Sequence, residues 1–459
     1  MAKRTKKEIA LTPEEKLQQE LVPVEEQPYP VPANWCWVRH NTILDISGGS
    51  QPAKSLFISE PRDGYIQLYQ TRDYGEHPVP VYIPIEYATK TTNEGDILLA
   101  RYGGSLGKVF RAHNGAYNVA LAKVTKLIPA TLNDEFLFLY YQSHFYQDFC
   151  VHAASGRSAQ AGFNRNDMDN LLFPLPPLPE QQRIVARIDS LFAKLDEVKE
   201  KAQAVVDGYE NRKAAILHKA FTGELTAKWR KEQGINITSW KHTDLQAVCS
   251  MKITDGTHKT PTYCERDEGF PFISAKDITG ETICWDNIKY IVPELHTELY
   301  ARLAPQRDDI LLAKNGTTGV AAIVDVDKVF DLYVTIAVLR PNKEIIEPRF
   351  LLDIVNSPIC KRQFDEHLTG IGVPNLHLRD IKAVAINLPI REEQKEIVHL
   401  VDSMIEAENT IKSAAESVLD QIDTMKKSIL ARAFRGELGT DDPSDEPAIE
   451  LLKRVLQEE

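Results

Sequence analysis

The segment that most resembles a chemical motif is the glycine-rich run Gly103-Gly104-Ser105-Leu106-Gly107-Lys108. In a phosphate-binding P-loop the lysine is followed by Ser or Thr, whose hydroxyl binds the Mg²⁺ ion. Val109 occupies that place here and the glycine spacing also differs, so the run does not predict nucleotide binding. The sequence has no HExxH metal spacing, no GxGxxG dinucleotide fingerprint and no methyltransferase tetrapeptide of the Asn-Pro-Pro-Tyr type. We therefore expect a chain with no catalysis, metal or cofactor of its own.

A long pattern occurs twice in the chain. Residues 180–225 align without a gap on residues 393–438, and about 18 of the 46 aligned positions are identical. Both copies open with Glu-Gln and close with Gly-Glu-Leu. A fixed internal period indicates a duplicated architecture.

Each copy predicts a long helix with a narrow apolar seam, because its apolar residues recur in alternating steps of four and three. The seam positions are Ile184, Ile188, Leu191, Leu195 and Val198 in the first copy and Ile397, Val401, Met404, Ile411 and Val418 in the second. Arg212 and Glu408 interrupt it. A helix of this length spans roughly 60–65 Å, more than a small domain. We expect the two copies to pair with each other as an antiparallel coiled coil; pairing with another subunit is the alternative.

The blocks upstream of the two helices also correspond, at the same offset. Gly95–Arg101 matches Asp308–Lys314, and short β-rich runs such as Ile97–Ala100 and Ile310–Ala313 are separated by Gly, Asn and Pro. We therefore predict an α+β fold class with two globular domains in tandem, each followed by a long helix. The expected boundaries are an N-terminal extension at 1–34, a first domain at 35–178, a central helix at 179–226, a linker at 227–239, a second domain at 240–389, a C-terminal helix at 390–438 and an acidic tail at 439–459.

Charge and composition say more about the cellular location of the protein than about its function. The net charge of −12 argues at first against nucleic acid, but about half of the excess lies in the acidic tail. A binding module needs only a locally positive face. No apolar run reaches the 18 residues of a membrane span, the N-terminus lacks an apolar signal region, and the six cysteines show no CxxC spacing. These features predict a cytoplasmic protein with reduced thiols.

The combination of two variable domains and two similar helices ending in Ala-Phe-(Thr/Arg)-Gly-Glu-Leu resembles the specificity subunit of type I restriction–modification enzymes. The second domain adds a local signature, Ile253-Thr254-Asp255-Gly256-Thr257-His258, followed by Phe270-Pro271-Phe272-Ile273-Ser274-Ala275-Lys276-Asp277-Ile278. It is similar to the start of that family's target recognition domain. The first domain departs from this pattern, since Asp45-Ile46-Ser47-Gly48-Gly49-Ser50-Gln51-Pro52 replaces the Asp-Gly-Thr-His element.

The resemblance implies that each target recognition domain reads one half of a bipartite site in double-stranded DNA. The helices would act as a spacer and would dock two methyltransferase subunits. S-adenosylmethionine, ATP and Mg²⁺ would then belong to partner subunits, namely the methyltransferase and a restriction subunit that joins through the complex.

Residues that read DNA are expected to carry hydrogen-bonding or cationic side chains on exposed loops. In the first domain these are Ser50, Gln51, Lys54, Gln70, Thr71, Arg72, Tyr74, Arg101, Tyr102, Ser105, Lys108, Arg157, Ser158 and Gln160. In the second domain they are Thr257, His258, Lys259, Lys276, Asp277, Lys314, Asn315, Thr317, Thr318, Asn375 and His377. Arg101 and Lys314 form the best pair, because they occupy the same point of both repeats. Replacing Lys314 by Ala is expected to weaken DNA binding and to leave folding intact.

Several alternatives stay open at this stage. Any one of these residues could instead be a solvated surface group or a turn residue, and Asp255-Gly256 could be a simple tight turn. Helix candidates at Pro13–Leu21 and Ile449–Leu456 could be solvated ends or additional methyltransferase contacts. The whole chain could also be a coiled-coil adaptor that binds proteins and no DNA, or an enzyme with cryptic activity.

Overall fold

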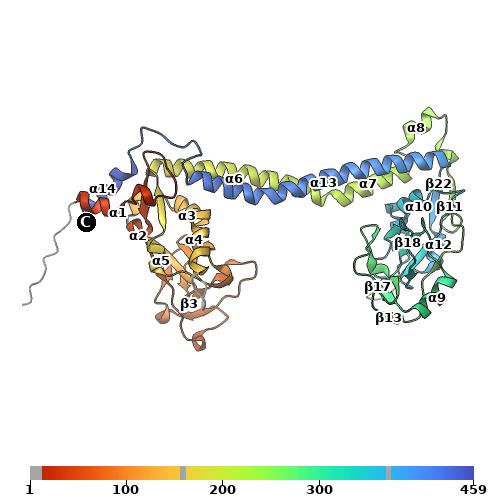
Figure 1. The fold of residues 1–459 in the computed structure, drawn as a ribbon, viewed down its shortest axis with the longest axis horizontal. Coiled ribbons are helices and arrows are strands. Elements are labelled where there is room, and N and C mark those ends of the chain that lie inside the picture. Colours follow the sequence, from red (N-terminus) through yellow and green to blue (C-terminus); the bar gives the residue numbers. More distant parts are fainter. Residues whose placement is uncertain (1–12, 156–161, 369–373, 459) are drawn as a thin grey trace, which may run out of the picture. The chain divides into compact units, whose positions relative to one another are not determined.

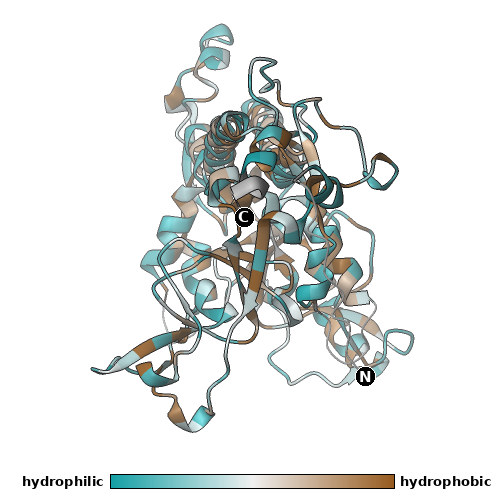
Figure 2. Cartoon of the chain, turned by 90° about the vertical axis from the view of Figure 1, so that its left-hand side faces the viewer, coloured by the Kyte–Doolittle hydropathy of each residue, from teal (hydrophilic) through white to brown (hydrophobic). Residues whose placement is uncertain are grey.

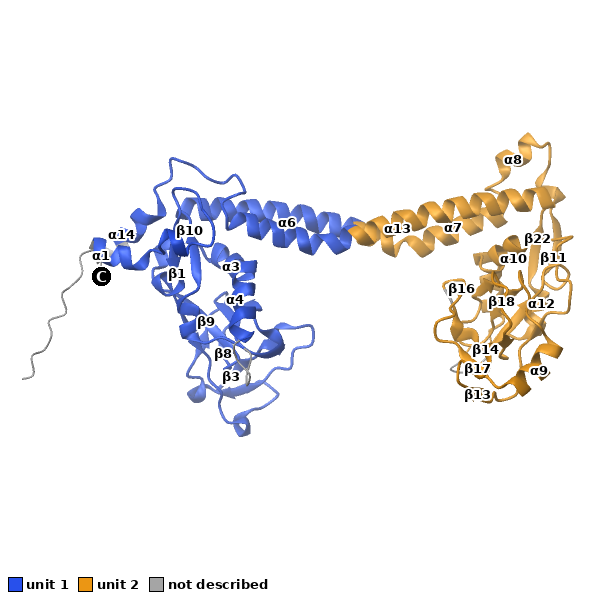
Figure 3. Ribbon diagram, in the orientation of Figure 1, with its two compact units in different colours: residues 1–201, 418–459 blue, residues 202–417 orange. Residues whose placement is uncertain are grey.

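The protein is described here by a computed structural model that covers residues 13–155, 162–368 and 374–458. The chain divides into two compact units (Figure 3). Unit 1 comprises Met1–Lys201 and Val418–Glu459, and unit 2 comprises Ala202–Ser417. The boundaries expected from the sequence follow chain order, whereas unit 1 gathers both ends of the chain.

Unit 1 contains two four-stranded sheets, ordered β2-β9-β6-β7 and β4-β3-β8-β5, and a two-stranded β1–β10 ribbon. The strands are β1 (Cys36–Arg39), β2 (Leu44–Gly48), β3 (Tyr65–Tyr69), β4 (Tyr82–Pro84), β5 (Thr91–Thr92), β6 (Ile97–Ala100), β7 (Val109–Arg111), β8 (Gly115–Tyr117), β9 (Leu121–Lys126) and β10 (Leu172–Leu175). Its shorter helices are α1 (Pro13–Glu20), α2 (His40–Ile43), α3 (Asp134–Gln142), α4 (His144–Ser155), α5 (Arg165–Asp169) and α14 (Ala448–Glu458) (Figure 1).

Unit 2 repeats this plan, with four-stranded sheets ordered β12-β21-β18-β19 and β13-β17-β14-β20 and with two-stranded β11–β22 and β15–β16 ribbons. The strands are β11 (Lys241–Asp244), β12 (Thr254–Asp255), β13 (Tyr263–Cys264), β14 (Phe270–Ile273), β15 (Ile278–Thr279), β16 (Thr282–Ile283), β17 (Lys289–Ile291), β18 (Ile310–Ala313), β19 (Ala321–Ile323), β20 (Asp331–Leu332), β21 (Ile336–Leu339) and β22 (Ala385–Leu388). The shorter helices are α8 (Ala227–Glu232), α9 (Pro293–Arg302), α10 (Pro348–Val355), α11 (Pro358–Glu366) and α12 (Leu378–Ala383).

The predicted mixture of helix and sheet is confirmed, and so is the repeat within it. The runs expected at Ile97–Ala100 and Ile310–Ala313 are β6 and β18, and every residue of both strands is buried. Each strand lies second from the edge of its sheet, between two antiparallel neighbours. In the hydropathy colouring of Figure 2 brown segments are concentrated in the strands, whereas the helices carry teal residues along their length. Among the described helices, none has the length and apolar character needed to cross a membrane.

The first long helix differs from the single helix expected at 179–226. It consists of α6 (Leu178–Asp207) and α7 (Tyr209–Phe221), separated at Gly208. Glycine is a poor helix former, and the Arg212 guanidinium donates to the Val205 carbonyl at 2.9 Å, beside this break. The second long helix, α13 (Arg391–Ala433), is uninterrupted. Gly223 and Gly436 follow the helix ends with φ of 81° and 72°, as expected for helix-terminating glycines.

The seam assignment is only partly right. Ile184, Ile188, Ile397 and Val401 are buried, and Leu191 and Leu195 are half-buried. Four expected seam residues are instead exposed: Val198 at 43%, Met404 at 39%, Ile411 at 49% and Val418 at 38%. The less exposed side of α13 continues from Val401 through Ile405, Glu408 and Lys412. Residues 404 and 405 are both apolar, so the sequence permits two sets of inward-facing positions, one through 404 and 411 and the other through 405, 408 and 412. The structure adopts the second set, which the sequence does not suggest because residues 408 and 412 are charged.

Each globular core packs against the start of one long helix and the end of the other. In unit 1 the core contains Ile184 and Ile188 of α6 together with Phe434, whose ring lies 5.1 Å from that of Phe136. In unit 2 it contains Ile397 of α13 together with Phe221, whose ring lies 5.2 Å from that of Phe350. The repeat therefore extends to the way in which each domain is attached to its helices.

A buried Glu-Gln pair at the start of each long helix makes this attachment polar as well as apolar. Glu180 accepts a hydrogen bond from the Trp35 indole at 2.8 Å, and Glu393 accepts one from the Trp240 indole at 2.9 Å. Gln181 donates to the Pro176 carbonyl at 3.0 Å, and its counterpart Gln394 donates to Pro389 at 2.9 Å. The Glu-Gln motif thus joins each domain to its helix.

The two glutamates differ in their charge environment. Glu393 accepts from the buried Arg230 guanidinium at 2.6 Å and from the Thr226 hydroxyl at 2.7 Å. Glu180 accepts from the Thr440 hydroxyl at 3.3 Å and has no ion pair within the described residues. Burial raises the pKa of Glu180, while the hydrogen bond from Trp35 lowers it.

The helix candidates near the chain ends are present as α1 and α14, which pack against each other within unit 1. Leu17 of α1 and Leu452 of α14 are buried in the unit 1 core. Arg183 forms an ion pair with Asp445, just before α14. The described part of the tail is therefore packed and not simply solvated; its expected contact with a methyltransferase stays a prediction.

Candidate nucleic-acid interface

In unit 2 the loop after β12 is fixed against the end of β20. Thr257 N–H donates to the Leu332 carbonyl and Val334 N–H donates to the Thr257 carbonyl, both at 2.9 Å. Gly256 lies so close to this strand that a Cβ atom would stand 2.1 Å from the Leu332 carbonyl oxygen. Only glycine fits there without moving backbone, which explains the second residue of the Asp-Gly-Thr-His element.

Several predicted residues of unit 2 come together around one hollow of about 350 Å³. It is lined by residues that include Ser274, Lys276, Asn315, Thr317, Tyr333 and Thr335. Asn315 also forms a β-bridge with Asn375. Lys276, Asn315, Thr317 and Asn375 are thereby brought into one cluster. Ser274, Tyr333 and Thr335 were missed by sequence reasoning; the first two directly follow the strands β14 and β20.

Three residues expected on exposed loops are instead buried, so the expectation of exposure is wrong for them. Thr257 is 5% exposed, and Asp277 and Lys314 are each 7% exposed. Lys314 Nζ lies 3.2 Å from Asp255 Oδ2, and the same oxygen is 3.3 Å from Nε2 of the exposed His258. Asp277 accepts from the Ser274 N–H at 2.8 Å, which closes the turn that carries Lys276. Their side chains hold the loops in place.

Gly48 of β2 occupies in unit 1 the register position that Asp255 of β12 occupies in unit 2. Gly48 pairs with Ala122, which pairs with Leu99 of β6, and Asp255 pairs with Ala337, which pairs with Leu312 of β18. This difference changes the surroundings of the cation that follows β6 or β18. A Cβ atom at Gly48 would stand 2.2 Å from Arg101 Nη1, so the guanidinium occupies the space above this glycine. Arg101 donates to the Tyr102 hydroxyl at 2.6 Å, and its Nε atom is buried without a hydrogen-bond partner in the described chain. Arg101 is half-buried and makes no ion pair with any described residue. Its charge is therefore not compensated by any described carboxylate of the unit.

The other loops of unit 1 meet near Asn118. Gly49 is so close to it that a Cβ atom would stand 2.2 Å from the Asn118 carbonyl oxygen, and Asn118 N–H donates to the Tyr69 carbonyl at 3.0 Å. The turn after β3 is closed by Gln70 N–H donating to Asp73 at 2.8 Å, the same device that Ser274 and Asp277 form in unit 2. The Ser50 hydroxyl and the Gln70 amide nitrogen are buried without a described partner.

The remaining predicted residues fall into three groups. Gln51, Lys54, Arg72, Lys108, His258, Lys259, Lys276, Thr317 and His377 are exposed. Thr71, Tyr74, Tyr102, Ser105, Asn315, Thr318 and Asn375 are half-buried, and Tyr74 stacks on Phe110 with ring centroids 4.5 Å apart. Arg157, Ser158 and Gln160 lie outside the described residues.

The glycine-rich run has a simple structural role. Gly103–Ser105 form a short 3₁₀ turn between the antiparallel strands β6 and β7. Its Gly-x-Ser-x-Gly spacing also occurs in hydrolase nucleophile elbows, but those lie between a strand and a helix. A strand follows here, so the geometry of such an elbow is not formed.

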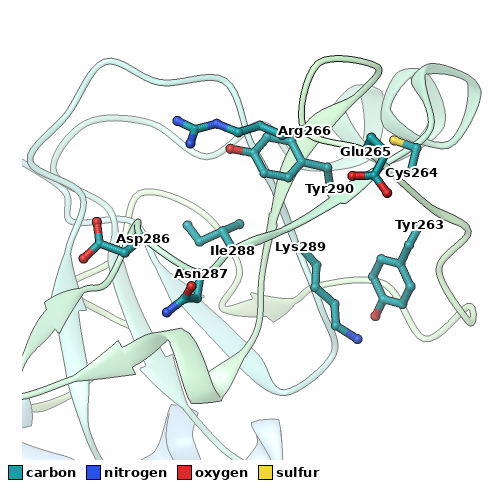
Figure 4. Close-up of a pocket in the computed structure, with 9 residues that line it drawn as sticks. All are labelled: Tyr263, Cys264, Glu265, Arg266, Asp286, Asn287, Ile288, Lys289 and Tyr290. Atoms are coloured by element: carbon teal, nitrogen blue, oxygen red, sulfur yellow. The ribbon is translucent and has the colours of Figure 1, made fainter.

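A second hollow of unit 2, of about 500 Å³, lies on β13 and β17 and contains no predicted residue (Figure 4). Lys289 Nζ stands 4.2 Å from the ring centre of the exposed Tyr263. Arg266 and Lys289 share this hollow with the carboxylates Glu265 and Asp286, so it is not electropositive. In the described ranges no group of three or more His, Cys, Asp or Glu side chains is placed to hold a metal ion.

Comparisons with known proteins agree with this duplicated architecture. Residues 32–206 and 238–420 match the type I restriction modification DNA specificity domain. The chain is 26% identical over 363 residues to the type I restriction enzyme EcoBI specificity subunit of Escherichia coli, which covers 72% of this chain and 76% of that protein. It is 24% identical over 423 residues to the MjaVIII specificity subunit of Methanocaldococcus jannaschii, with 89% and 94% covered.

The fold has a solved counterpart. A crystal structure of the HsdS subunit from Thermoanaerobacter tengcongensis superposes with a TM-score of 0.61 at 21% identity, covering 90% of this chain and 100% of that one. Each of the two segments that match the family model corresponds to one repeat and contains one of the loop clusters described above. The chain belongs to the family of type I restriction enzyme specificity subunits and carries two DNA specificity domains in tandem.

Proposed function

We propose that this specificity subunit reads a bipartite site in double-stranded DNA, one half with the loop cluster of each unit. The observation that carries the proposal is Arg101, a half-buried guanidinium without an ion pair in the described chain. A buried charge left unpaired costs free energy, which an anionic ligand would recover. A guanidinium makes bidentate hydrogen bonds to a DNA phosphate, which is anionic, or to the O6 and N7 acceptors of guanine.

The two loop clusters share an aspartate-closed turn and a glycine packed against a backbone carbonyl, but their side chains differ. Such a difference is expected of two domains that recognise different half-sites. In unit 2 we assign base contacts to the rim of the 350 Å³ hollow, where the Asn315 amide can donate and accept hydrogen bonds and the Lys276 ammonium can donate them. Thr257, Asp277 and Lys314 are assigned to positioning, because their side chains are buried. The remaining exposed predicted residues stay candidates for phosphate contacts.

Binding of the complete complex to a defined duplex tests the proposal. The chain, assembled with its methyltransferase subunits, should bind one discontinuous sequence and lose that binding when either half-site is scrambled. A change in the sequence between the half-sites should have little effect, whereas a change in its length should abolish binding. Equal affinity for cognate and scrambled duplexes would support the adaptor alternative instead.

We also propose that α6 and α7 pair with α13 as an antiparallel coiled coil that sets the spacing of the half-sites. Supporting contacts occur in each unit: Lys426 lies 2.6 Å from Asp196 in unit 1, and Arg212 lies 2.6 Å from Glu408 in unit 2. Arg212 and Glu408 are the two residues that interrupt the seam expected from the sequence, and their charges compensate each other. A single polar layer of this kind specifies register in coiled coils.

Charge reversal should reveal this pairing. Arg212→Glu and Glu408→Arg are each expected to destabilise unit 2 by about 1.5–3 kcal/mol, towards the lower end because Arg212 remains 35% exposed. The double reversal should restore most of the loss, since the two charges again attract. Thermal unfolding of the three variants measures this. A double variant no more stable than the singles would show that the two side chains do not act as a pair.

Methyltransferase subunits are proposed to dock on the outward side of α13. Met404, Ile411, Val418 and Met425 recur every seventh residue there and are all exposed, between 38% and 49%. An apolar stripe on a helix marks a protein contact rather than a nucleic-acid contact. S-adenosylmethionine-dependent methylation would then reside in those two partners and the ATP-driven steps in restriction subunits, with no catalysis in this chain.

Ile411→Asp is expected to weaken methyltransferase association at least about tenfold, because it places a charge in an apolar contact. Ile411 is 49% exposed, so the fold should tolerate the change. Ser413→Asp, also on the exposed surface of α13, is the matched control and should bind normally. Titration of the methyltransferase subunit onto each variant measures the difference. Docking elsewhere would leave both variants with the affinity of the parent chain.

A further inference from the structure

The cations of the two loop clusters differ in a systematic way. Among the predicted DNA contacts of unit 1, four cations form no ion pair with a described residue: Lys54, Arg72, Arg101 and Lys108. In unit 2 the three predicted lysines and His258 each lie within ion-pair distance of a carboxylate. The pairs are His258–Asp255 at 3.3 Å, Lys259–Glu298 at 2.5 Å, Lys276–Asp277 at 3.9 Å and Lys314–Asp255 at 3.2 Å.

Arg72 and Lys276 make the comparison directly, because they occupy the same place in the same turn. Each is followed by the aspartate that closes the turn, Asp73 or Asp277. Asp73 accepts from the backbone N–H groups of Gln70 and Val79, at 2.8 and 3.3 Å, and forms no ion pair with Arg72. Lys276 Nζ lies 3.9 Å from the second oxygen of Asp277. The same turn therefore presents in unit 1 a cation that no described carboxylate pairs with, and in unit 2 a partly compensated one.

Arg101 and Lys314 differ for a reason that the sequence contains. Asp255 stands beside Lys314 and neutralises it, whereas Gly48 stands at the same point of the first repeat and leaves room for the Arg101 guanidinium. One substitution between repeats, aspartate against glycine, decides whether the cation is internally paired. The two units thus differ in ion pairing both at the cation after β6 or β18 and at the cation in the exposed turn.

We infer that unit 1 supplies most of the salt-dependent part of this subunit's affinity for the DNA backbone. Unit 2 recognises its half-site mainly through hydrogen bonds and the shape of its hollow. A free cation that neutralises a phosphate releases a condensed counterion, and this release sets the slope of log affinity against log salt. A cation already paired with a carboxylate must leave that partner, so its net contribution to the slope is smaller. This inference rests on the proposed function.

The test uses the complex of this chain with its methyltransferase subunits and its cognate duplex, with affinity measured across a range of salt concentrations. Arg72→Gln, Lys54→Gln and Lys108→Gln keep polar side chains and remove charge; each is expected to reduce the slope by about 1. Lys276→Gln and Lys259→Gln are the matched unit 2 variants and should change the slope by much less. All five residues are exposed, so the fold should be retained.

Two results would overturn the inference: equal slope changes for Arg72→Gln and Lys276→Gln, or an unchanged slope for all three unit 1 variants. Neither would affect sequence-specific binding by the parent complex. Failure of the parent complex to distinguish cognate from scrambled duplex would instead contradict the proposed function. The two failures are therefore separable in one set of titrations.

Discussion

Replacing Glu393 by Gln is expected to lower the stability of unit 2 by about 3–5 kcal/mol. Glu393 is fully buried and is the carboxylate that neutralises Arg230, itself buried and donating to Glu393, to the Thr226 hydroxyl and to the Gly223 carbonyl. Glutamine can keep the hydrogen bond from Trp240, but it leaves the guanidinium buried without its counter-charge. The melting temperature of this unit should fall by roughly 6–20 °C.

The duplication provides the matched control for this prediction. Glu180 occupies the same helix position and accepts the same indole hydrogen bond, but it has no ion pair among the described residues. Burial raises the pKa of Glu180, so the neutral glutamine removes an unfavourable charge as well as a hydrogen-bond acceptor. Glu180→Gln should therefore destabilise unit 1 by much less than Glu393→Gln destabilises unit 2. Calorimetry of the full chain, with one transition shifted and the other not, measures both. Equal losses in the two variants would mean that Arg230 does not need its partner.

Arg101→Ala is expected to weaken specific binding of the assembled complex by about 10- to 150-fold, which corresponds to the 1.5–3 kcal/mol of a hydrogen bond to a charged group. Arg101→Lys should recover only part of this loss, because an ammonium cannot make the bidentate contact of a guanidinium. Stability should change little, since Arg101 compensates no carboxylate within the described chain. Fluorescence anisotropy on the cognate duplex provides the measurement.

Lys314→Ala is the contrasting variant, and here the structure changes the expectation drawn from sequence. Removing Lys314 leaves Asp255 buried beside the exposed His258 alone, so we now expect the thermal stability of unit 2 to fall and DNA binding to weaken as a consequence. If Arg101→Ala destabilised unit 1 as strongly and DNA affinity were unchanged, Arg101 would be a structural residue like Lys314.

The structural features that could be predicted from the sequence are those in which a local residue pattern occurs twice at a fixed offset. The strands β6 and β18 were predictable because four consecutive apolar residues recur at a fixed offset, and the helix ends because glycine follows each of them. The Glu-Gln pair stood out as a repeated motif, but its burial did not, since its partners Trp35 and Trp240 lie about 150 residues upstream.

The errors have a common origin in side-chain context that pattern alone does not contain. Met404 and Ile405 are both apolar, so spacing could not decide which faces inward. Lys314 looks like Arg101 in an alignment of the repeats, yet Asp255 and Gly48 give them opposite surroundings. Comparing those two partner positions across the repeat was the one signal that could have revealed the difference.

The most direct test of the central claim is to map methylated adenines in the genome of a cell that expresses this chain with its methyltransferase subunits. We expect one motif made of two specific half-sites separated by a fixed number of unspecified base pairs. We also expect that exchanging the loop cluster of one unit changes only one half of that motif. A continuous motif, or methylation that does not depend on this chain, would contradict the claim.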